Sequence, residues 1–599
     1  MNKANVFSKR SMVAGLAVAW KKIMNRKTAI RTGLLASLIF IFAFGMFPGP
    51  AKAAPFSIPL ENLTGLDPTQ YTIYVLGYST TSGMMLNPDG TFQQIPPGNG
   101  IIPSYAVGSG PGMLSKITVD GSVSLPGARI YFFVATAKTP APSLPYSNGG
   151  INVTQPANPP NSNYPPFGFI ELTMNPSYST TPVIDVQTVD AFIFPITITL
   201  NDNLGQVGQP RPAGVVTRES IFQSYTKFME SLGTLGQPYV GLRFTEAGGG
   251  LLNPYDYLIE TNAANEYVHL SSTLNTVFDP VLNTLFSNKD LSLQGVAYGS
   301  IPADVYTVVS TTPQNYPGST FSVPALQFKG QQYNNVFNIF NPVGLTVYLN
   351  PKTHAPIKGT IVNTSLTFSE SLPAKTLVEN MYVGGAGTNP ANTIASLVLN
   401  KQGEITGATL NQNLGSPAPN STYIFSKVPA LFVSSGAMVF GNVGVFADST
   451  VQYPTNGDSQ AVLANLENQI VSALNRGVAN PMIMRANPAP SGYTSAFWNT
   501  ETYWYPHHEP QNLFSLYMHT GRVESNGIST PIFVQPNSPA QNAPPVKNAQ
   551  GQYMGMAYGF AYDETPGGPG PAGQPQVPSK FDPTPAGTTT MTVTLGPWK

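Results

Sequence analysis

The sequence predicts a mainly β fold with a few helices, and three features of the 599-residue chain carry this prediction. Glycine and proline occur 56 and 58 times, and neither residue suits the interior of a helix. Short runs rich in β-branched and aromatic residues recur between segments rich in Gly and Pro, which is typical of strands and their connections. Apolar residues make up 41% of the chain, which is enough for a large core and excludes a disordered protein.

The predicted strands follow from these runs. Four of them lie in the first third of the chain, at 71–77, 128–134, 167–174 and 183–200, and a last one lies at 588–595. Residues 345–430 are rich in Asn, Thr, Ser and Gly and contain few aromatic residues, which indicates an inserted β-rich segment.

Apolar residues recur with helical spacing in four stretches. The first is 217–232, with Thr217 as its N-cap, and the second is 267–278. The third begins at Asp279-Pro280, because Asp caps a helix and Pro suits its first turn. The fourth is 461–476, and Gly477 is expected to terminate it. We therefore expect residues 211–344 and 431–499 to form a mixed α/β part of the protein.

The first 53 residues carry the features of a secretory signal peptide. They hold nine basic residues and no acidic one, and they include an apolar run at 33–47. Ala51-Lys52-Ala53 then presents small residues at the two positions that a signal peptidase reads, so cleavage should leave Ala54 at the N-terminus. An uncleaved anchor is the alternative, although the run is short for a span of about 20 residues. Translation could start at Met1 or at Met24. An exported chain without cysteine indicates a secreted bacterial protein.

Composition and motifs exclude several functional classes. From residue 54 onward 20 basic residues face 29 acidic ones, a net charge of −9, which argues against a nucleic-acid partner. Without cysteine there are no disulfides, thiolate metal sites or cysteine nucleophiles. The common nucleotide-binding, zinc-protease and serine-hydrolase motifs are missing. His507, His508, Glu509 and His519 lie close together in the sequence, but adjacent histidines on a strand point to opposite faces and rarely share one metal ion. We expect neither a metal nor another cofactor.

Two carboxylates remain as candidates for chemistry. Glu171 and Asp190 each lie in an apolar stretch, and 175–182 between them is predicted to be the loop of a hairpin. The midpoint of the two positions falls inside that loop, so they could be near cross-strand neighbours on one face. Two carboxylates with opposed roles, one acid and one base, are what glycoside hydrolysis needs. The alternative is one buried acid bonded to backbone amides and one exposed acid.

Several short motifs, in order, resemble glycoside hydrolase family 64, the bacterial β-1,3-glucanases that release laminaripentaose. The first three are ARIYF at 128–132, FIELTMN at 169–175 and VDAF at 189–192. ALNRG at 473–477, the asparagine-to-histidine spacing of a family strand at 512–519, and AYGFAYD at 557–563 follow. The resemblance covers about residues 65–345 and 430–597, and the segment between them has no counterpart that we can place.

The resemblance implies a specific architecture and mechanism. A small β-barrel would pack on a thaumatin-like β-sandwich domain with a wide open groove between them, and 54–210 with 500–599 would form the β-rich barrel or sandwich part that carries the carboxylates. Glu171 would be the general acid and Asp190 the general base of an inverting mechanism. Thr173 and Asn175 match residues that line the sugar groove. Met174 departs from the family, which has a sugar-stacking tryptophan there.

The last motif adds further candidates for sugar binding. Tyr558, Tyr562 and Asp563 could line the groove, because aromatic faces stack on sugars and carboxylates bind hydroxyls. Ala561 and Glu564 replace the proline and the second aspartate of the family's motif. The aromatic cluster at 503–505 would bind glycan if it is exposed and would merely seal the barrel if it is packed.

The expected function is therefore secreted, endo-acting hydrolysis of a β-1,3-glucan of the laminarin or curdlan type. We expect a monomer that has no nucleic-acid partner and no membrane attachment after signal cleavage. The alternative is a non-catalytic extracellular glucan-binding or surface protein on the same scaffold. Retention of both Glu171 and Asp190 favours the enzyme, since binding alone does not require the pair.

Overall fold

The computed structural model describes residues 56–120, 123–156, 165–174, 183–187, 191–200, 206–208, 216–244, 249–262, 266–385, 391–429, 431–441, 456–481, 498, 503–506, 509–532 and 590–598. Strands dominate this part of the chain, which confirms the predicted β-rich fold with a few helices. The predicted signal peptide lies outside the described residues.

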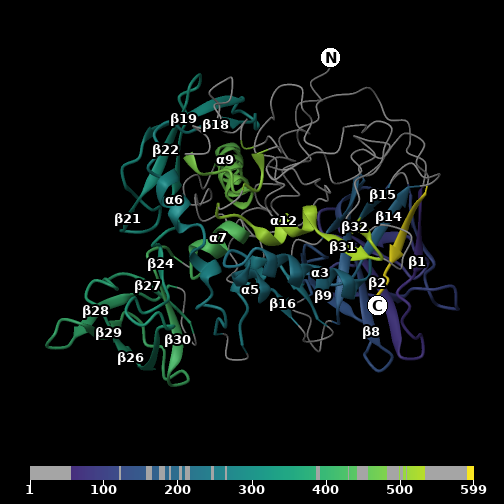
Figure 1. The fold of residues 1–599 in the computed structure, drawn as a ribbon, viewed down its shortest axis with the longest axis horizontal. Helices are drawn as coiled ribbons and strands as arrows, with labels where there is room; N and C mark the ends of the chain where they lie inside the picture. Colours follow the sequence, from purple (N-terminus) through teal and green to yellow (C-terminus); the bar gives the residue numbers. More distant parts are fainter. Residues whose placement is uncertain are drawn as a thin grey trace, which may run out of the picture.

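Two sheets that pack face to face form a sandwich, at the right of Figure 1. The first runs in the order β15-β14-β33-β1-β7, and its strands are β1 (Phe56–Asn62), β7 (Lys116–Val119), β14 (Ile196–Leu200), β15 (Gln206–Gly208) and β33 (Met591–Leu595). The second runs β12-β11-β8-β2-β3-β4 with β6 beside β2. Its strands are β2 (Tyr71–Ser79), β3 (Met84–Leu86), β4 (Phe92–Gln94), β6 (Tyr105–Ala106), β8 (Leu125–Thr136), β11 (Phe167–Met174) and β12 (Val183–Gln187).

The predicted strands of this sandwich are confirmed, with one correction. The runs at 71–77, 128–134, 167–174 and 588–595 correspond to β2, β8, β11 and β33. The run at 183–200 is not one strand, because it is divided among β12, β13 (Ala191–Phe192) and β14, which belong to three different sheets. A small sheet of β5 (Gly100–Pro103), β9 (Ser143–Ser147) and β10 (Asn152–Val153) packs on the second sheet of the sandwich.

The middle of the molecule is a helical part with small sheets. Its helices are α3 (Arg218–Ser231), α4 (Gln237–Val240), α5 (Pro254–Leu258), α6 (Asp279–Leu285), α7 (Ser435–Gly441), α9 (Gly457–Asn475) and α12 (Leu513–Thr520). Its strands are β16 (Arg243–Phe244), β17 (Gly250–Leu252), β18 (Ser292–Gly295), β19 (Asp304–Ser310), β20 (Gln314–Asn315), β21 (Ser322–Val323), β22 (Ala325–Gly330), β23 (Val336–Phe340), β31 (Arg522–Ser525) and β32 (Ile528–Pro531). β17 lies between β13 and β16 in a small sheet and pairs with both.

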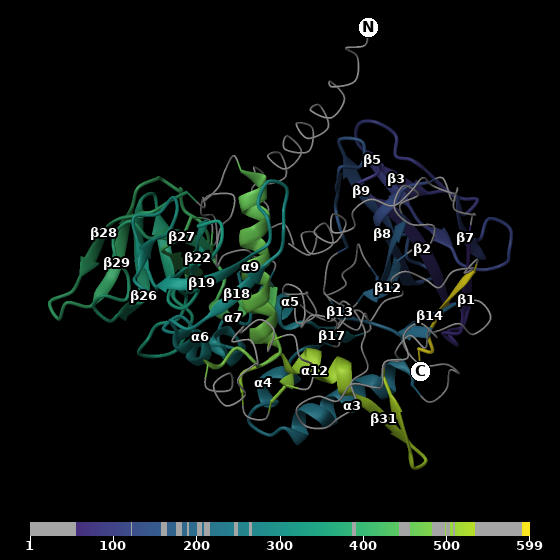
Figure 2. The same cartoon turned by 90° about the horizontal axis from the view of Figure 1, so that it is seen from above.

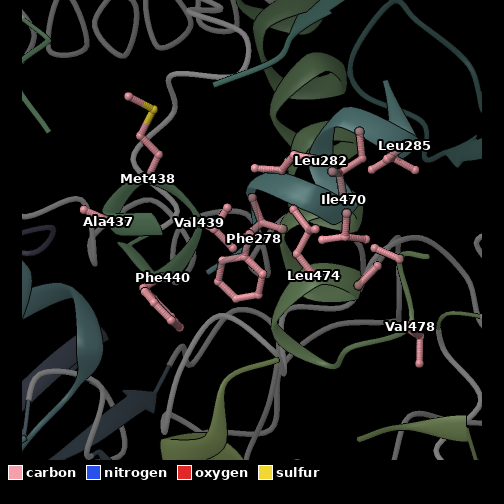
Figure 3. Packing of buried hydrophobic residues seen from close by; sticks show 14 of the residues in the cluster. Phe278, Leu282, Leu285, Ala437, Met438, Val439, Phe440, Ile470, Leu474 and Val478 are labelled. Atoms are coloured by element: carbon pink, nitrogen blue, oxygen red, sulfur yellow. The ribbon is translucent and has the colours of Figure 1, made fainter. Parts of the chain in front are cut away.

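Apolar side chains from α3, α6, α7, α9 and α12 share one core in this part. Figure 3 shows Phe278, Ile470 and Leu474 pointing into the same space between α6, α7 and α9. The rings of Phe278 and Phe440 meet edge to face with centroids 5.0 Å apart. Aromatic contacts of this kind stabilise a core beyond the area they bury.

Two predicted helices are confirmed together with their caps. At α3 the Thr217 side chain accepts from the Ser220 N–H, and the Ser220 hydroxyl bonds back to the Thr217 backbone. α9 begins earlier than predicted because Asn456 caps it, and Gly477 follows its C-terminus at φ +72. α6 is also present, but its N-cap is Phe278 rather than Asp279.

Two other element predictions are wrong. Residues 267–278 hold only a short 3₁₀ helix at Thr273–Thr276, because Tyr267 pairs with Thr261 in an isolated bridge and the Asn275 side chain donates to the carbonyls of His269, Leu270 and Ser272. Residues 512–519, matched to a family strand, fold as α12, which the Asn512 side chain caps by accepting from the Ser515 N–H. All eight residues of α12 are buried, so no alternation of exposed and buried positions marks it as a strand.

Seven strands of the segment predicted as an insertion form a sheet of their own, at the lower left of Figure 1. They are β24 (Thr346–Val347), β25 (Lys358–Val362), β26 (Ser365–Leu372), β27 (Tyr382–Gly385), β28 (Ile394–Leu399), β29 (Ile405–Leu410) and β30 (Ser421–Ser426). We call this sheet the 346–426 sheet, and it has a separate apolar core. Figures 1 and 2 place it and the sandwich at opposite ends, with the helices between them.

No helix among the described residues is long and apolar enough to cross a membrane.

Candidate functional site

The pleat of β11 sends alternate side chains to the two faces of its sheet. Ile170 and Leu172 enter the sandwich core, so Phe169, Glu171 and Thr173 share the opposite, outer face. This is the reason that a carboxylate can stand in an apolar strand without entering the core.

The strand register places four residues in one row across the sheet. Tyr78 of β2 lies opposite Arg129 of β8, Arg129 lies opposite Glu171 of β11, and Glu171 lies opposite Asp185 of β12. The next row, on the same face, holds Leu76, Tyr131, Phe169 and Gln187. Arg129 and Glu171 therefore lie next to the aromatic residues Tyr131 and Phe169 on the same face of the sheet.

Arg129 and Glu171 form an ion pair in this row. The Arg129 Nε lies 3.8 Å from the Glu171 Oε2, and each side chain is 12% exposed. The Arg129 guanidinium also lies over the Phe169 ring, 5.3 Å from its centroid. Because both partners are largely buried, water screens their attraction less than it does at an open surface.

Aromatic rings extend from this pair toward β2. Tyr131 stacks on Phe169 with centroids 5.0 Å apart, and Tyr78 stacks on Tyr131 at 6.0 Å with an angle of 10° between the rings. Burial raises the pKa of Tyr78 well above its usual range, Tyr131 raises it further, and the positive charge of Arg129 acts in the opposite direction. Tyr78 therefore stays neutral beside the charged pair.

A bulge in β8 lies on the other side of Glu171. The β8–β11 register shifts between Leu172 and Met174, and Gly127 has a φ of +56 there. Such a bulge favours glycine, which adopts positive φ without a Cβ clash. The Gly127 N–H donates to the Thr173 Oγ1 at 3.0 Å, and a Cβ added to Gly127 would lie 3.8 Å from the Glu171 Oε1.

The hairpin that was predicted to join the two carboxylates is present, but its predicted register is wrong. Glu171 pairs with Asp185, and the ladder ends at the pair of Phe169 with Gln187. The prediction paired Glu171 with a position near 190, whereas the observed partner is five residues earlier, at 185. Asp190 lies outside the described residues, so its place relative to Glu171 stays a prediction.

Of the predicted sugar-binding residues, the structure describes Thr173, and its sugar-binding role stays a prediction. Thr173 lies on the outer face with Glu171 and accepts the hydrogen bond from Gly127. Asn175, Tyr558, Tyr562 and Asp563 lie outside the described residues.

Met174 was expected to remove one sugar-stacking platform, because it stands where the family has a tryptophan. The structure places Met174 in the sandwich core, 1% exposed, so its side chain is not available to stack on a sugar. The reason is the pleat of β11, which puts Met174 on the same face as Ile170 and Leu172.

The aromatic cluster at 503–505 takes the packed alternative. Trp504 and Tyr505 are buried in the core of the helical part, and the Arg476 guanidinium lies 4.0 Å from the Trp504 ring centroid. His519 is 2% exposed and packs beside Tyr505, whereas His507 and His508 lie outside the described residues. The described part of the chain contains no group of three His, Asp or Glu side chains that could hold a metal ion.

Sequence reasoning missed Arg129, Gly127 and Asp185 as members of the site. Arg129 was included in the ARIYF motif but was given no role. Its signal was available, because a charged residue alternates there with the buried Ile130 and Phe132 along one strand. The register that aligns Asp185 carries no comparable signal in the sequence.

Residues 54–288 match the family model Glyco_hydro_64, described as beta-1,3-glucanase. The chain is similar to a solved beta-1,3-glucanase domain (GH64) from Clostridium beijerinckii, at 14% identity and a TM-score of 0.42, over 92% of this chain and 100% of that one. It is also similar to a GH family 64 laminaripentaose-producing beta-1,3-glucanase from Paenibacillus barengoltzii, at 18% identity and a TM-score of 0.23, over 40% of this chain and 56% of that one.

The same Paenibacillus barengoltzii enzyme complexed with laminarihexaose matches at 18% identity and a TM-score of 0.23, over 37% of this chain and 53% of that one. A search of curated proteins finds no match. The family model spans β8 and β11 and therefore includes Arg129, Glu171 and Thr173. Residues 54–288 thus match the model of glycoside hydrolase family 64, the beta-1,3-glucanases, in agreement with the resemblance found in the sequence motifs.

Proposed function

We propose that the protein is a secreted, endo-acting β-1,3-glucanase that inverts the anomeric centre, with Glu171 as general acid and Asp190 as general base. The observation that carries the proposal is the position of Glu171. It is a mostly buried carboxylate on the outer face of β11, inside the segment that matches the glucanase family.

Burial distinguishes Glu171 from an ordinary surface carboxylate. Its side chain is 12% exposed, so water is mostly excluded while contact with a bound sugar stays open. Thr173 lies two residues along the same face and is proposed to bind a sugar hydroxyl. The glucan would then run over this outer face, where the resemblance places the groove.

Asp190 is proposed as the base because it matches the family's VDF-type motif. An inverting pair needs about 6.5–9.5 Å between its carboxyl groups so that a water fits between them. Asp185, which lies opposite Glu171 in the ladder, provides a matched aspartate in the same hairpin against which Asp190 can be tested.

The experiment incubates the purified protein with laminarin or curdlan and follows the first products by proton NMR. Wild type should release the α-anomer, since an inverting base directs water to the face opposite the leaving group. Glu171→Gln should lose about 10²–10⁴-fold in rate, the usual contribution of general acid catalysis. Asp190→Asn should abolish turnover and keep glucan binding, whereas Asp185→Asn should stay active.

Each contrary result has a definite meaning. A β-anomer as first product would show retention and remove the general-base role from Asp190. Near-normal cleavage by Glu171→Gln would refute the acid, and inactivity of Asp185→Asn alone would move the base to Asp185. Glucan binding by wild type without any cleavage would favour a non-catalytic glucan-binding protein.

Secretion is proposed on the sequence of residues 1–53 alone. The basic segment, the apolar run at 33–47 and Ala51-Lys52-Ala53 support export, and a polymeric glucan is a substrate found outside the cell.

A further inference from the structure

We propose that Arg129 is a positioning residue that holds Glu171 by its Oε2 and thereby leaves Oε1 as the oxygen that donates the catalytic proton. The inference rests on the proposed role of Glu171 as general acid. It adds which of the two carboxyl oxygens reacts, and which residues make them different.

The first step is that the two oxygens of Glu171 have different neighbours. Oε2 lies 3.8 Å from the Arg129 Nε. Oε1 faces Gly127, since a Cβ built on that glycine would lie 3.8 Å from it. No other heavy atom of the described residues, chain neighbours aside, lies within 4 Å of that Cβ position. Oε1 therefore borders a space that exists because residue 127 has no side chain.

The second step is that Arg129 is itself held in place. Its guanidinium lies over Phe169, Phe169 stacks on Tyr131, and Tyr131 stacks on Tyr78. The strand register puts Arg129 directly opposite Glu171, so the two Cβ atoms are fixed neighbours. A planar guanidinium that packs on an aromatic ring can fix the orientation of the Glu171 carboxyl group more firmly than a flexible lysine ammonium can.

The third step is that Gly127 is also held. Its N–H donates to the Thr173 Oγ1 at 3.0 Å, and its φ of +56 disfavours any residue with a Cβ. Thr173 therefore shapes the space beside Oε1 by fixing Gly127, in addition to any sugar that it binds.

These contacts fit the proton-transfer step. The proton leaves the Glu171 Oε1 for the glycosidic oxygen while the bond from that oxygen to the anomeric carbon breaks, and the bonding pair stays on the leaving oxygen. Water adds to the anomeric carbon and gives its proton to Asp190. Glu171 is left as a carboxylate, and the charge that develops on it is stabilised by Arg129.

The test separates positioning of the acid from general damage by varying the leaving group. Laminarin has a poor leaving group that needs protonation, whereas a 2,4-dinitrophenyl β-laminaribioside has one that departs without an acid. Arg129→Met should lower kcat on laminarin about 10–100-fold, since misplacing a catalytic group by about 1 Å can cost 10²-fold. Its KM on laminarin should change little, and its kcat on the aryl substrate should stay near that of wild type.

Two further experiments test the positive charge of Arg129. Added guanidinium ion should restore part of the laminarin activity of Arg129→Ala, because it can occupy the vacated position. Arg129→Lys, which keeps the charge without the planar group, should fall between Arg129→Met and wild type. The matched control is Arg243→Met, which removes a guanidinium that likewise pairs with a glutamate, Glu219, at 3.5 Å and lies near a ring, that of Phe222. It should leave both substrates unaffected.

The space beside Oε1 is tested separately. Gly127→Ala should lower kcat/KM on laminarin about tenfold, because its methyl group occupies the approach to Oε1. Gly403→Ala is its control, since Gly403 also has a positive φ, +78, and meets nothing within 4 Å. It should cause comparable backbone strain without a kinetic effect.

The outcomes are distinguishable. A wild type that cleaves no β-1,3-glucan overturns the proposed function, and this inference with it. A wild type that is active while folded Arg129→Met keeps full kcat, or loses both substrates equally, overturns this inference alone. If Arg129→Met does not fold, as judged by circular dichroism and thermal melting, Arg129→Lys decides. Equal cleavage of laminarin by that variant and wild type would then overturn the role of Arg129.

Discussion

Three buried or nearly buried arginines in this protein have different surroundings, and the difference supports the role proposed for one of them. Arg218 donates to the carbonyls of Ile193 and Gly249 and lies between the rings of Phe222 and Trp598. Burial lowers the pKa of Arg218 to about 10. Arg476 donates to the carbonyl of Trp498 and lies over the Trp504 ring. Arg129 also lies over a ring, but it faces a carboxylate.

Gly477 shows how a single backbone angle limits the sequence. It follows α9 at φ +72, and an added Cβ would lie 2.9 Å from the Gln511 Oε1 and 3.2 Å from the Pro506 Cδ. We expect Gly477→Ala to destabilise the fold by about 2–4 kcal/mol, from the positive φ and the crowding together. Gly403→Ala should cost only about 1 kcal/mol, because nothing crowds its Cβ. Urea unfolding of both variants checks this, and equal losses would mean that Gln511 and Pro506 move aside at no cost.

For single residues, the sequence predicted the features that depend on local backbone geometry. Thr217 and Gly477 were found at the ends of their helices because a cap needs only its own neighbours. The outer position of Glu171 agrees with the period-2 pattern of its strand. The pairing of Glu171 with Asp185 was missed, because a strand register depends on a turn whose shape the pattern does not reveal.

Three tyrosines join the helices of the central part to one another. The Tyr225 hydroxyl of α3 donates to the Tyr239 carbonyl of α4, and the Tyr239 hydroxyl donates to the Gln511 carbonyl just before α12. The Tyr517 hydroxyl of α12 donates back to the Ile221 carbonyl of α3. All three side chains are buried, and burial raises the pKa of each above its usual value of 10.

These tyrosines predict an alkaline loss of stability. A group whose pKa is raised by folding contributes stability that is fully present below its unfolded pKa and is lost as the pH rises above it. Each tyrosine should therefore lower the free energy of unfolding by about 1.4 kcal/mol per pH unit above pH 10. We expect the free energy of unfolding in urea to fall by about 4 kcal/mol between pH 9 and 11 from the three together.

Tyr225→Phe is the matched variant for this prediction. It removes one ionisable hydroxyl and one hydrogen bond, so it should be less stable at pH 8 and should lose stability less steeply above pH 10. An unchanged slope in Tyr225→Phe would show that Tyr225 does not contribute to the alkaline loss.

The two elements that were predicted wrongly have different physical causes. Residues 512–519 form α12, and every residue of α12 is buried in the core that it shares with α3, α7 and α9. Residues 267–278 carry helical spacing, but the Asn275 side chain bonds the carbonyls that a helix would use and closes a turn instead. For α12, contacts from elsewhere in the sequence decide the structure, whereas at 267–278 a side chain of the segment itself competes with the helix.

The molecule as a whole has separate cores rather than one. The sandwich that carries Glu171, the helical part and the 346–426 sheet each bury their own apolar cluster. The 346–426 sheet meets the helical part through a small cluster that includes Leu270, Tyr348 and Ile424. The Glu266 carboxylate adds one contact by accepting from the Thr422 N–H at 2.8 Å. The amino-acid composition of residues 345–430 predicted this segment, but no local sequence pattern indicated what it packs against.

This organisation predicts that the 346–426 sheet can be removed. Its two ends are adjacent, since the Lys427 N–H donates to the Leu345 carbonyl at 2.9 Å and Thr346 pairs with Ser426. A two-residue Asn-Gly turn should therefore connect Leu345 to Lys427. The core of the helical part does not include the buried residues of this sheet, so the shortened protein should fold, less stable by about 2–4 kcal/mol because Leu270 and its neighbours become exposed.

Activity of the shortened protein tests where the chemistry lies. Glu171 and Arg129 belong to the sandwich, at the end of the molecule opposite the 346–426 sheet (Figures 1 and 2), so the initial rate on laminarin should stay within about threefold of wild type. Glu266→Ala in the full chain is the control for docking alone, since it removes the contact to Thr422 and keeps the sheet. A shortened protein that melts cooperatively but no longer cleaves laminarin would show that the sheet takes part in substrate binding. One that fails to melt cooperatively, while Glu266→Ala does, would show that the helical part depends on the sheet for its own fold.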